Sequence, residues 1–526
     1  MKRFLYFAFC LALLIFWSSC RKDFNFTPSF GALEFSKDTV YLDTVFTNIG
    51  SSTYNLKVYN RSDDDIVIPT LRLGQGQSSN YRLNVDGLTG EGPIAGKEFE
   101  NVELLANDSM YIFIETTIDI QDLVSSETQF LYTDAIEFDS GSNLQTVELV
   151  TLVKDAVFIY PQRFIDSQTG EYVIETLTFD VDGDGIEDET TIQGRFLEPN
   201  ELNFTNEKPY VIYGYAAVDE GETLTIDAGA RVHFHANSGL LITNDASLQV
   251  NGTPSMDEDL LEGEVIFEGD RLEPLFEDVP GPWQTIWLFN GSTNNTINHA
   301  TIKNSTVGLV VDGDMNDPTK LTITNSQIYN SSNFGILGRG SSIYGENVVI
   351  NRSGQSSFAG TFGGSYNFVH ATIANYWTNS FRQFPSVFLN NYIVDEDQNT
   401  FTNPLMEANF TNCIIYGNDN PEFLVDNDPS EVFNFKLTNC LLRFDSDNFT
   451  GPLYDFGDSN LYENVIRNQD PEFLDGINNQ LQIPNGSPGD GFAIPFGMLG
   501  VDILNTPRGN PADVGAYESI VFPEDD

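Results

Sequence analysis

The stretch that decides the fold runs from Gly221 to Gly252 and reads GETLTIDAGARVHFHANSGLLITNDASLQVNG. Apolar pairs two residues apart recur in it every eight residues: Leu224 with Ile226, Val232 with Phe234, Leu240 with Ile242, and Leu248 with Val250. Residues two apart share one face of a strand. Turn residues such as Asn-Ser-Gly separate the pairs. Strands this short cannot bury their apolar faces alone, so the pattern predicts coils stacked on coils, a β-solenoid.

The length and charge of the chain limit the possible functions. With 526 residues the chain is too long for one compact core, whereas a solenoid grows along one axis. It carries 77 Asp and Glu against 25 Lys and Arg, a net charge of −52. Such a charge repels phosphate backbones, which excludes nucleic-acid binding. It could attract divalent cations or basic partners, or simply keep the surface solvated.

The first residues predict a secretory signal peptide over 1–19. Two basic residues precede a short apolar run and then Ser18, Ser19 and Cys20. The last three resemble a bacterial lipobox, although Trp17 stands where an aliphatic residue is usual. The resemblance implies cleavage before Cys20 and lipidation of its sulfur, with the membrane as a partner through the lipid. The charged residues that follow resemble those of Bacteroidetes lipoproteins, which implies anchoring in the bacterial cell envelope, at the outer membrane and at the cell surface. The alternative is an ordinary secreted protein.

The next two segments are expected to be a tether over 20–32 and a β-sandwich over 33–154. The strands of the second segment are longer than those of the solenoid and alternate in polarity, as in an immunoglobulin-like sandwich. Residues 46–50, FTNIG, resemble the start of such domains. A domain of this kind is a spacer or a binding module, and we expect a spacer.

A junction is expected over 155–207, and it contains an Asp-rich loop. Asp180, Asp182 and Asp184 alternate before Gly185, and Asp188 follows. Alternating carboxylates before a glycine supply the hard oxygen ligands and the turn of a calcium loop. No helical pattern flanks the loop, so an EF-hand is not expected. The pattern predicts a structural Ca²⁺ held by Asp180, Asp182, Asp184 and Asp188, or alternatively a polar turn between two strands.

The segment over 208–526 resembles the right-handed parallel β-helix of pectin-lyase-like proteins. The resemblance lies in Leu224 to Gly252 and in the closing sequence Asp513 to Glu518, DVGAYE. It implies an all-β protein in which an immunoglobulin-like β-sandwich precedes a right-handed parallel β-helix. It specifies the fold and says little about function.

A recurring asparagine after short strands is predicted to form ladders between coils. The positions are Asn304, Asn325, Asn351, Asn375, Asn412 and Asn439. Cys413 and Cys440 each follow one of these asparagines, and backbones in neighbouring coils lie about 4.8 Å apart. That spacing is compatible with a disulfide, but stacked side chains can point in parallel, so we expect two buried free thiols.

No catalytic residues are predicted. Arg339, Arg352, Arg382 and His370 are expected to be surface or turn residues. Tyr376 and Trp377 are the candidates for stacking on a sugar ring, with packing as their alternative role.

The leading hypothesis is a lipid-anchored envelope protein whose β-helix binds or adheres without catalysis, with polysaccharide as the candidate partner. The alternatives are a polysaccharide lyase or glycoside hydrolase on the same β-helix, and a purely structural envelope component. The oligomeric state is left open.

Overall fold

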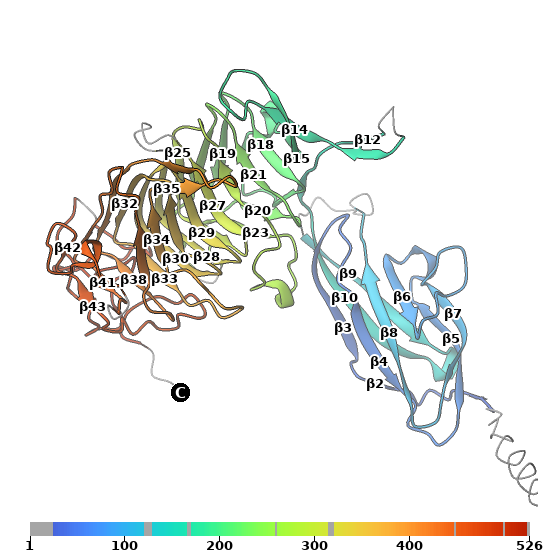
Figure 1. The fold of residues 1–526 in the computed structure, drawn as a ribbon. Coiled ribbons are helices and arrows are strands. Elements are labelled where there is room, and N and C mark those ends of the chain that lie inside the picture. Colours follow the sequence, from blue (N-terminus) through green and yellow to red (C-terminus); the bar gives the residue numbers. More distant parts are fainter. Residues whose placement is uncertain are drawn as a thin grey trace, which may run out of the picture. The chain divides into compact units, whose positions relative to one another are not determined.

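The computed structural model describes residues 25–119, 129–165, 170–257, 260–313, 320–445, 449–497 and 500–522. The expected signal peptide and Cys20 lie outside these residues. The chain forms two compact units, Met1–Asp155 and Ala156–Asp526. Both are built from strands (Figure 1). Among the described residues, no helix has the length and apolar character needed to cross a bilayer.

The first unit is a β-sandwich of two sheets. One sheet has the order β1-β5-β9-β10-β3, with β7 paired to β5, and the other has the order β2-β4-β8-β6. The strands are β1 (Thr27–Pro28), β2 (Glu34–Phe35), β3 (Thr39–Phe46), β4 (Tyr54–Tyr59), β5 (Ile66–Leu73), β6 (Tyr81–Val85), β7 (Glu98–Leu104), β8 (Ser109–Thr116), β9 (Gln129–Phe138) and β10 (Gln145–Lys154).

Alternation of apolar and polar residues builds the core of this sandwich. In β8, Ile112 and Ile114 are fully buried, whereas Tyr111 and Phe113 are exposed on the opposite face. Side chains of both sheets meet in one apolar cluster, for example Leu56 of β4 with Leu71 of β5. The sandwich is thus held by its own core, and its immunoglobulin-like character stays a prediction.

The second unit is a parallel β-helix with a nineteen-stranded and a ten-stranded sheet. The nineteen-stranded sheet comprises β11 (Val157–Ile159), β16 (Asn203–Phe204), β17 (Tyr210–Ile212), β19 (Thr223–Asp227), β20 (Arg231–Phe234), β22 (Ser247–Asn251), β23 (Val265–Gly269), β25 (Asn295–Asn298), β26 (Ala300–Lys303), β28 (Leu321–Ser331), β30 (Ser342–Ser353), β32 (Gly364–Val369), β33 (Thr372–Asn375), β37 (Leu405–Thr411), β38 (Ile414–Gly417), β40 (Lys436–Thr438), β41 (Leu441–Leu442), β42 (Tyr462–Glu463) and β43 (Ile466–Arg467). The ten-stranded sheet comprises β14 (Thr176–Phe179), β15 (Asp188–Phe196), β18 (Tyr215–Val218), β21 (Gly239–Ile242), β24 (Ile286–Leu288), β27 (Val307–Asp312), β29 (Phe334–Arg339), β31 (Phe358–Thr361), β34 (Val387–Asn390) and β39 (Phe423–Asp426).

The register confirms the eight-residue period. Strands β19, β20 and β21 form successive faces of one coil, and β22 returns to lie parallel on β19 with Leu248 beside Leu224 and Val250 beside Ile226. The apolar pairs point inward and are fully buried. Each coil therefore buries its pairs against those of the coils above and below, as the sequence predicts.

The coils turn at two corners that use left-handed backbone. At the first corner, seven stacked positions have φ between +45° and +55°: His299, Asn325, Asn347, His370, Asn412, Asn439 and Asn464. Asparagine is tolerated there because its short polar side chain bonds locally. Asn347 Nδ2 donates to Asn325 Oδ1 at 3.0 Å, and at the second corner Asn330 Nδ2 donates to Asn304 Oδ1 at 2.6 Å. The predicted asparagine ladder is present in part, and it is two ladders at two corners. Asn351 and Asn375 do not belong to them: Asn351 Nδ2 donates to Asn479 Oδ1 of the closing segment, and Asn375 Nδ2 donates to the carbonyl oxygen of Ser353.

The two cysteines next to the first corner are buried and free, as expected. Cys413 Sγ lies 3.3 Å from the carbonyl oxygen of Thr411, and Cys440 Sγ lies 3.2 Å from that of Phe410. Burial raises the pKa of the Cys413 thiol. Both thiols therefore serve as small apolar core residues.

The segment expected as a junction over 155–207 belongs to the β-helix, which corrects that boundary. Strands β11, β15 and β16 pair in parallel with β17, β18 and β19. Strand β14 pairs antiparallel with β15, and Leu177 and Phe179 of β14 pack on Leu241 of β21. Two further hairpins project from the coils: β12 (Arg163–Ile165) with β13 (Tyr172–Ile174), and β35 (Tyr392–Val394) with β36 (Thr400–Thr402).

The residues after β43 fold back over the outer face of the nineteen-stranded sheet. We call residues 469–497 and 500–522 the closing segment. Its Leu481 and Ala516 pack on Val349 and Ala374, and its Ile483 packs on Ile414. These contacts bring together residues that are 69 to 167 positions apart in the sequence, and the closing segment forms one wall of the site described next.

Candidate functional site

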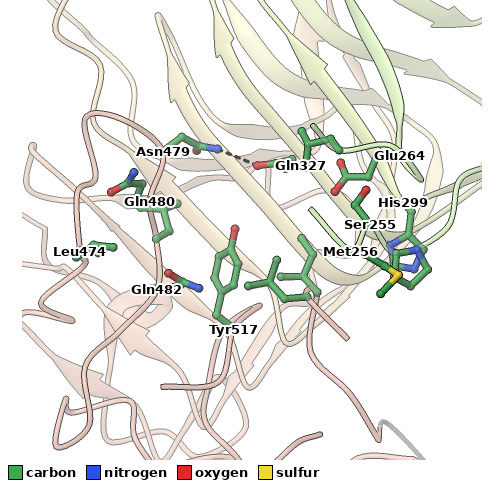
Figure 2. A pocket seen from close by; sticks show the side chains of 15 residues that line it. Ser255, Met256, Glu264, His299, Gln327, Leu474, Asn479, Gln480, Gln482 and Tyr517 are labelled. Carbon is green, nitrogen blue, oxygen red and sulfur yellow. Dashed lines mark hydrogen bonds between the residues drawn. The ribbon is translucent and has the colours of Figure 1, made fainter. Parts of the chain in front are cut away.

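A cleft with a volume of about 510 Å³ opens where the closing segment stops short of the earlier coils. Its floor is formed by Gln327 of β28, by Glu264 just before β23 and by His299 at the corner between β25 and β26 (Figure 2). One wall comes from the loop after β22, which contributes Ser255 and Met256. The opposite wall comes from the closing segment: Leu474, Asn479, Gln480, Gln482, Leu504 and Tyr517. The lining is thus rich in amides and hydroxyls.

A continuous chain of side-chain hydrogen bonds joins three lining residues of this cleft, Asn479, Gln327 and Glu264, with two buried ones. Asn351 Nδ2 donates to Asn479 Oδ1 at 3.2 Å, and Asn479 Nδ2 donates to Gln327 Oε1 at 3.0 Å, the contact drawn in Figure 2. Gln327 Nε2 donates to Thr301 Oγ1 at 3.0 Å. Thr301 Oγ1 then donates to Glu264 Oε2 at 2.7 Å. We call these five residues the amide chain.

The direction of the amide chain is fixed by its first member. The backbone N–H of Tyr376 donates to Asn351 Oδ1 at 3.1 Å, and because a backbone N–H can only donate, Asn351 must present its amide nitrogen to the next residue. Every later amide follows the same orientation, so Thr301 must point its hydroxyl hydrogen at Glu264. The chain therefore delivers one hydrogen-bond donor to one carboxylate oxygen.

Glu264 is the end point of the chain and the one acidic side chain among the described lining residues. Burial raises the pKa of its carboxyl, and the hydrogen bond from Thr301 and the charge of Arg231 oppose that shift only in part. The Arg231 guanidinium also donates to the backbone oxygens of Glu264 and Leu261, at 2.7 and 2.8 Å. Arg231 therefore fixes the loop wall while Glu264 holds a proton more readily than an exposed glutamate would.

His299 occupies the first corner column, where most neighbours are asparagine. Its φ is +45° and its side chain is almost fully buried. Burial lowers the pKa of the imidazole, so the ring stays neutral at neutral pH. It therefore contributes an apolar ring with a polar edge to the floor of the cleft, and no charge.

The charged side chains beside the cleft neutralise one another. Lys303 Nζ lies 3.0 Å from Glu268 Oε2, and His233 Nδ1 lies 3.6 Å from Glu268 Oε1. Burial alone would raise the pKa of Glu268, but the charges of His233 and Lys303 lower it. This cluster is internally paired, and it leaves Glu264 as the acidic group that faces the cleft.

The structure corrects the predicted sugar platform at Tyr376 and Trp377. Trp377 is only 6 % exposed, and its indole nitrogen donates to Ser380 Oγ at 2.9 Å. Tyr376 packs edge-on against Phe473, with ring centroids 6.0 Å apart. Tyr376 is covered because the closing segment, whose position the local sequence does not reveal, packs against it.

The structure also shows that three of the four basic candidates are buried. Arg352 and His370 are turn residues, with φ of +52° and +48°, but they are not on the surface. Arg382 forms a buried ion pair with Glu422, with Nη2 2.6 Å from Oε1. Arg339 is exposed and pairs with Asp312 at 2.5 Å.

The Asp-rich loop brings three of its four predicted ligands together. Ligand oxygens of Asp180, Asp182 and Asp188 lie within 4.8 Å of one another, a separation that two ligands of one Ca²⁺ at 2.3–2.6 Å can have. Asp184 is not in the group, and its carboxylate accepts the backbone N–H of Ile186 at 2.8 Å. Three of the four expected ligands are therefore close enough to share a Ca²⁺, and the place of Asp184 in the ligand set stays a prediction.

Sequence reasoning missed the amide chain. Thr301 and Gln327 are neighbours in register between β26 and β28, and a search for polar residues that stack on one outward row would have found them. Asn479 gives no such signal, because it reaches the row only when the closing segment folds back. Glu264 is one acidic residue among many, and what sets it apart is its place in the cleft together with a raised pKa.

Comparison with known proteins gives no family assignment. No family model matches the chain, and no curated protein matches it. Among solved structures, the catalytic unit of a GH87 α-1,3-glucanase from Streptomyces thermodiastaticus strain HF3-3 is 10 % identical over 74 % of this chain and 79 % of that one, with a TM-score of 0.21. A GH87 α-1,3-glucanase catalytic domain in complex with nigerose is 11 % identical over 80 % and 88 %, with a TM-score of 0.20. A family 123 glycoside hydrolase from Clostridium perfringens is 9 % identical, and the match spans 24 % of this chain and 30 % of that one, with a TM-score of 0.17. Because these TM-scores are low, we assign the β-helix fold from the strand pairing within this chain.

Proposed function

We propose that the cleft binds a segment of an uncharged polysaccharide. The amide chain is the observation that carries the proposal, because it fixes two amides of the lining, Asn479 and Gln327, and holds them through buried partners behind the wall. Sugars present hydroxyls that both donate and accept, and oriented amides match them. Tyr517 and Met256 add ring and thioether surface to the walls.

The charge of the cleft selects against acidic glycans. The described lining residues include one carboxylate, Glu264, and neither Lys nor Arg. The chain as a whole carries a net charge of −52. Uronate or sulfate groups would meet negative charge without a cation to pair with, so an uncharged glycan is the better ligand.

Retention and turnover on the purified mature protein test this proposal. The protein is immobilised and offered neutral and acidic polysaccharides, and glycan chain length is measured after incubation in solution. Retention of a neutral glycan with unchanged chain length supports binding without catalysis. Failure to retain any glycan would reject the proposal and favour a purely structural envelope role.

Hydrolysis is the second candidate, and the raised pKa of Glu264 is the observation that favours it. A carboxyl that holds its proton can act as the general acid toward a glycosidic oxygen. Hydrolysis also needs a second carboxylate on the other side of the bond, and none stands among the described lining residues besides Glu264. Shortening of a neutral glycan that is lost in Glu264→Gln, with retention preserved, would establish this activity.

Lipid anchoring through Cys20 is part of the same proposal. The basic start, the apolar run and the Ser-Ser-Cys sequence support it. A thioether-linked lipid would hold the protein at the outer membrane and present the cleft to envelope or external polysaccharide. Expression with a labelled fatty acid tests this step, and we expect label in the wild-type protein and none in Cys20→Ser.

A further inference from the structure

The outer face of the four-stranded sheet in the sandwich carries two exposed aromatic rings at its middle. Strand β8 lies between β4 and β6 in this sheet. Its Tyr111 and Phe113 are 46 % and 42 % exposed, whereas Ile112 between them is fully buried in the core. The two rings are close to parallel, with 17° between their planes and 6.2 Å between their centroids. Exposed large apolar side chains that gather on one face indicate a binding surface.

Amides flank these rings on both sides. The register of the sheet places Asn55 of β4 and Asn84 of β6 opposite Phe113, and both asparagines are exposed. A ligand that lies on the Phe113 ring therefore has an amide at each side, and an amide both donates and accepts hydrogen bonds.

A lysine stands beside the second ring. Lys57 of β4 is opposite Tyr111 in the register. Its Nζ lies 5.2 Å from the centroid of the Tyr111 ring and 5.3 Å from that of Tyr59, and both distances fit cation–π contacts. The two rings therefore hold the ammonium group in place. We call Asn55, Lys57, Asn84, Tyr111 and Phe113 the aromatic face.

Lys57 differs from the neighbouring cations in its partners. Arg82 pairs with Glu115 at 3.6 Å, and Arg61 pairs with Glu34 at 2.8 Å. Within the described part of the chain, Lys57 has ring partners and no carboxylate partner. An anionic ligand can therefore pair with Lys57 without displacing a carboxylate of the protein.

The negative charge of the rest of the chain acts weakly on such a ligand. The backbone N–H of Asp86 donates to the carbonyl oxygen of Tyr111 at 3.1 Å, which places Asp86 on the other side of β8 from Lys57. Two strand spacings, about 10 Å, separate their backbones. Charges more than about 8 Å apart are largely screened at physiological ionic strength. The contact with Lys57 therefore outweighs both Asp86 and the net charge of −52.

We propose that the aromatic face binds a glycan of the polyuronate class, in which the sugar rings carry carboxylates. The C–H face of a sugar ring packs on Tyr111 and Phe113, its carboxylate pairs with Lys57 Nζ, and its hydroxyls bond to the two asparagines. A neutral glycan lacks the ion pair, and an acidic peptide lacks the flat ring. The sandwich is then a binding module rather than a spacer. The site is separate from the cleft, and the proposal does not rest on the cleft's function.

Matched ligands separate the contribution of the sugar ring from that of its charge. Isothermal titration of the full mature chain compares an oligogalacturonate, its fully methyl-esterified form and an oligoglutamate peptide of the same charge. Esterification keeps the rings and removes the charge, whereas the peptide keeps the charge and has no rings. We expect saturable binding of the oligogalacturonate, about tenfold weaker binding of its ester, and no saturable binding of the peptide.

Variants assign the binding to the aromatic face. Phe113→Thr removes one ring without touching Lys57, and we expect about five- to tenfold weaker binding of the oligogalacturonate. Tyr41→Thr removes a 69 % exposed ring from β3 in the other sheet, and this matched control is expected to leave binding unchanged. Lys57→Gln is expected to lower the affinity for the oligogalacturonate to that for its ester, whereas Lys57→Arg keeps the preference.

The cleft variant Gln327→Leu distinguishes the two sites, and we expect it to bind the oligogalacturonate as wild type does. If Phe113→Thr does not fold, Lys57→Gln decides alone, because it keeps both rings. The proposal is overturned by no saturable binding of the oligogalacturonate, by equal affinity for its ester, or by equally tight binding of the peptide. Binding that is lost in Gln327→Leu and unchanged in Phe113→Thr would place the glycan in the cleft and would also overturn it.

Discussion

Thr301 and Glu264 stand on neighbouring coils, and the Thr301 hydroxyl donates to the Glu264 carboxylate at 2.7 Å. This contact ends a chain of oriented side chains that starts at the backbone of Tyr376. It leaves the second carboxylate oxygen, Oε1, for the proton or for a ligand. The cleft therefore contains one carboxyl group, Glu264. Burial raises its pKa, and the amide chain fixes its orientation.

The raised pKa of Glu264 predicts a specific pH dependence of stability. Above its ordinary pKa of 4.5, an unfolded Glu264 loses its proton while the folded protein still holds it. The folded state then binds more protons, so this residue's contribution to stability falls as pH rises through that window. Glu264→Gln lacks this titration.

Denaturant unfolding of both proteins between pH 4 and 8 measures the effect. We expect the free energy of unfolding of Glu264→Gln, relative to wild type, to rise with pH above about 4.5. A difference that stays constant or falls with pH would contradict the raised pKa.

The Arg382–Glu422 pair predicts a large cost for breaking a buried ion pair. The side chains are 2 % and 0 % exposed, and Glu422 Oε2 also accepts the backbone N–H of Ser386 at 2.8 Å. Arg382→Met leaves that carboxylate buried without its cation, and we expect a loss of about 3–5 kcal/mol in the free energy of unfolding. Lys436→Met breaks the more exposed Lys436–Glu463 pair and should cost about 0–1 kcal/mol. Equal losses in the two variants would show that burial does not set the cost.

The two buried thiols predict protection from modification. Cys413 and Cys440 lie in the apolar core, and burial raises the pKa of Cys413, which disfavours the reactive thiolate. We expect an aromatic disulfide reagent at pH 8 to leave both unmodified in the folded protein and to modify both in denaturant. Rapid reaction of the folded protein, or no free thiol after unfolding, would contradict the assignment.

Calcium binding by the Asp-rich loop stays a prediction, and the structure suggests which aspartates matter most. Asp180, Asp182 and Asp188 are close enough to share one ion, whereas Asp184 lies outside that group. We expect Ca²⁺ to raise the melting temperature, Asp182→Asn to remove most of that increase, and Asp184→Asn to keep it. Equal loss in both variants would restore Asp184 to the ligand set.

The repeat was predictable from sequence because a solenoid is a local structure. The pairs Leu224 with Ile226 and Leu248 with Val250 specify both the inward face and the stacking of the next coil. Four of the six predicted asparagines are corner residues, because few other residues tolerate a positive φ: Asn304, Asn325, Asn412 and Asn439.

The cleft was not predictable, because it depends on contacts between distant segments. Asn479 meets Gln327 across 152 positions, and no local pattern encodes that return. The same return covers Tyr376, whose aromatic character had suggested a binding surface. Arg382 and His370 were expected to be surface or turn residues, and both are buried. The sequence alone does not distinguish them from exposed polar residues.

The affinity of the mature protein for uncharged oligosaccharides tests the central claim most directly. Isothermal titration compares wild type with Gln327→Leu, which breaks the amide chain at its middle, and with Gln249→Leu, which removes a partly buried glutamine outside the cleft. The account predicts binding of at least one neutral glycan by wild type, about tenfold weaker binding by Gln327→Leu and unchanged binding by Gln249→Leu. Absence of binding to every neutral glycan, or equal affinity of Gln327→Leu and wild type, would contradict it.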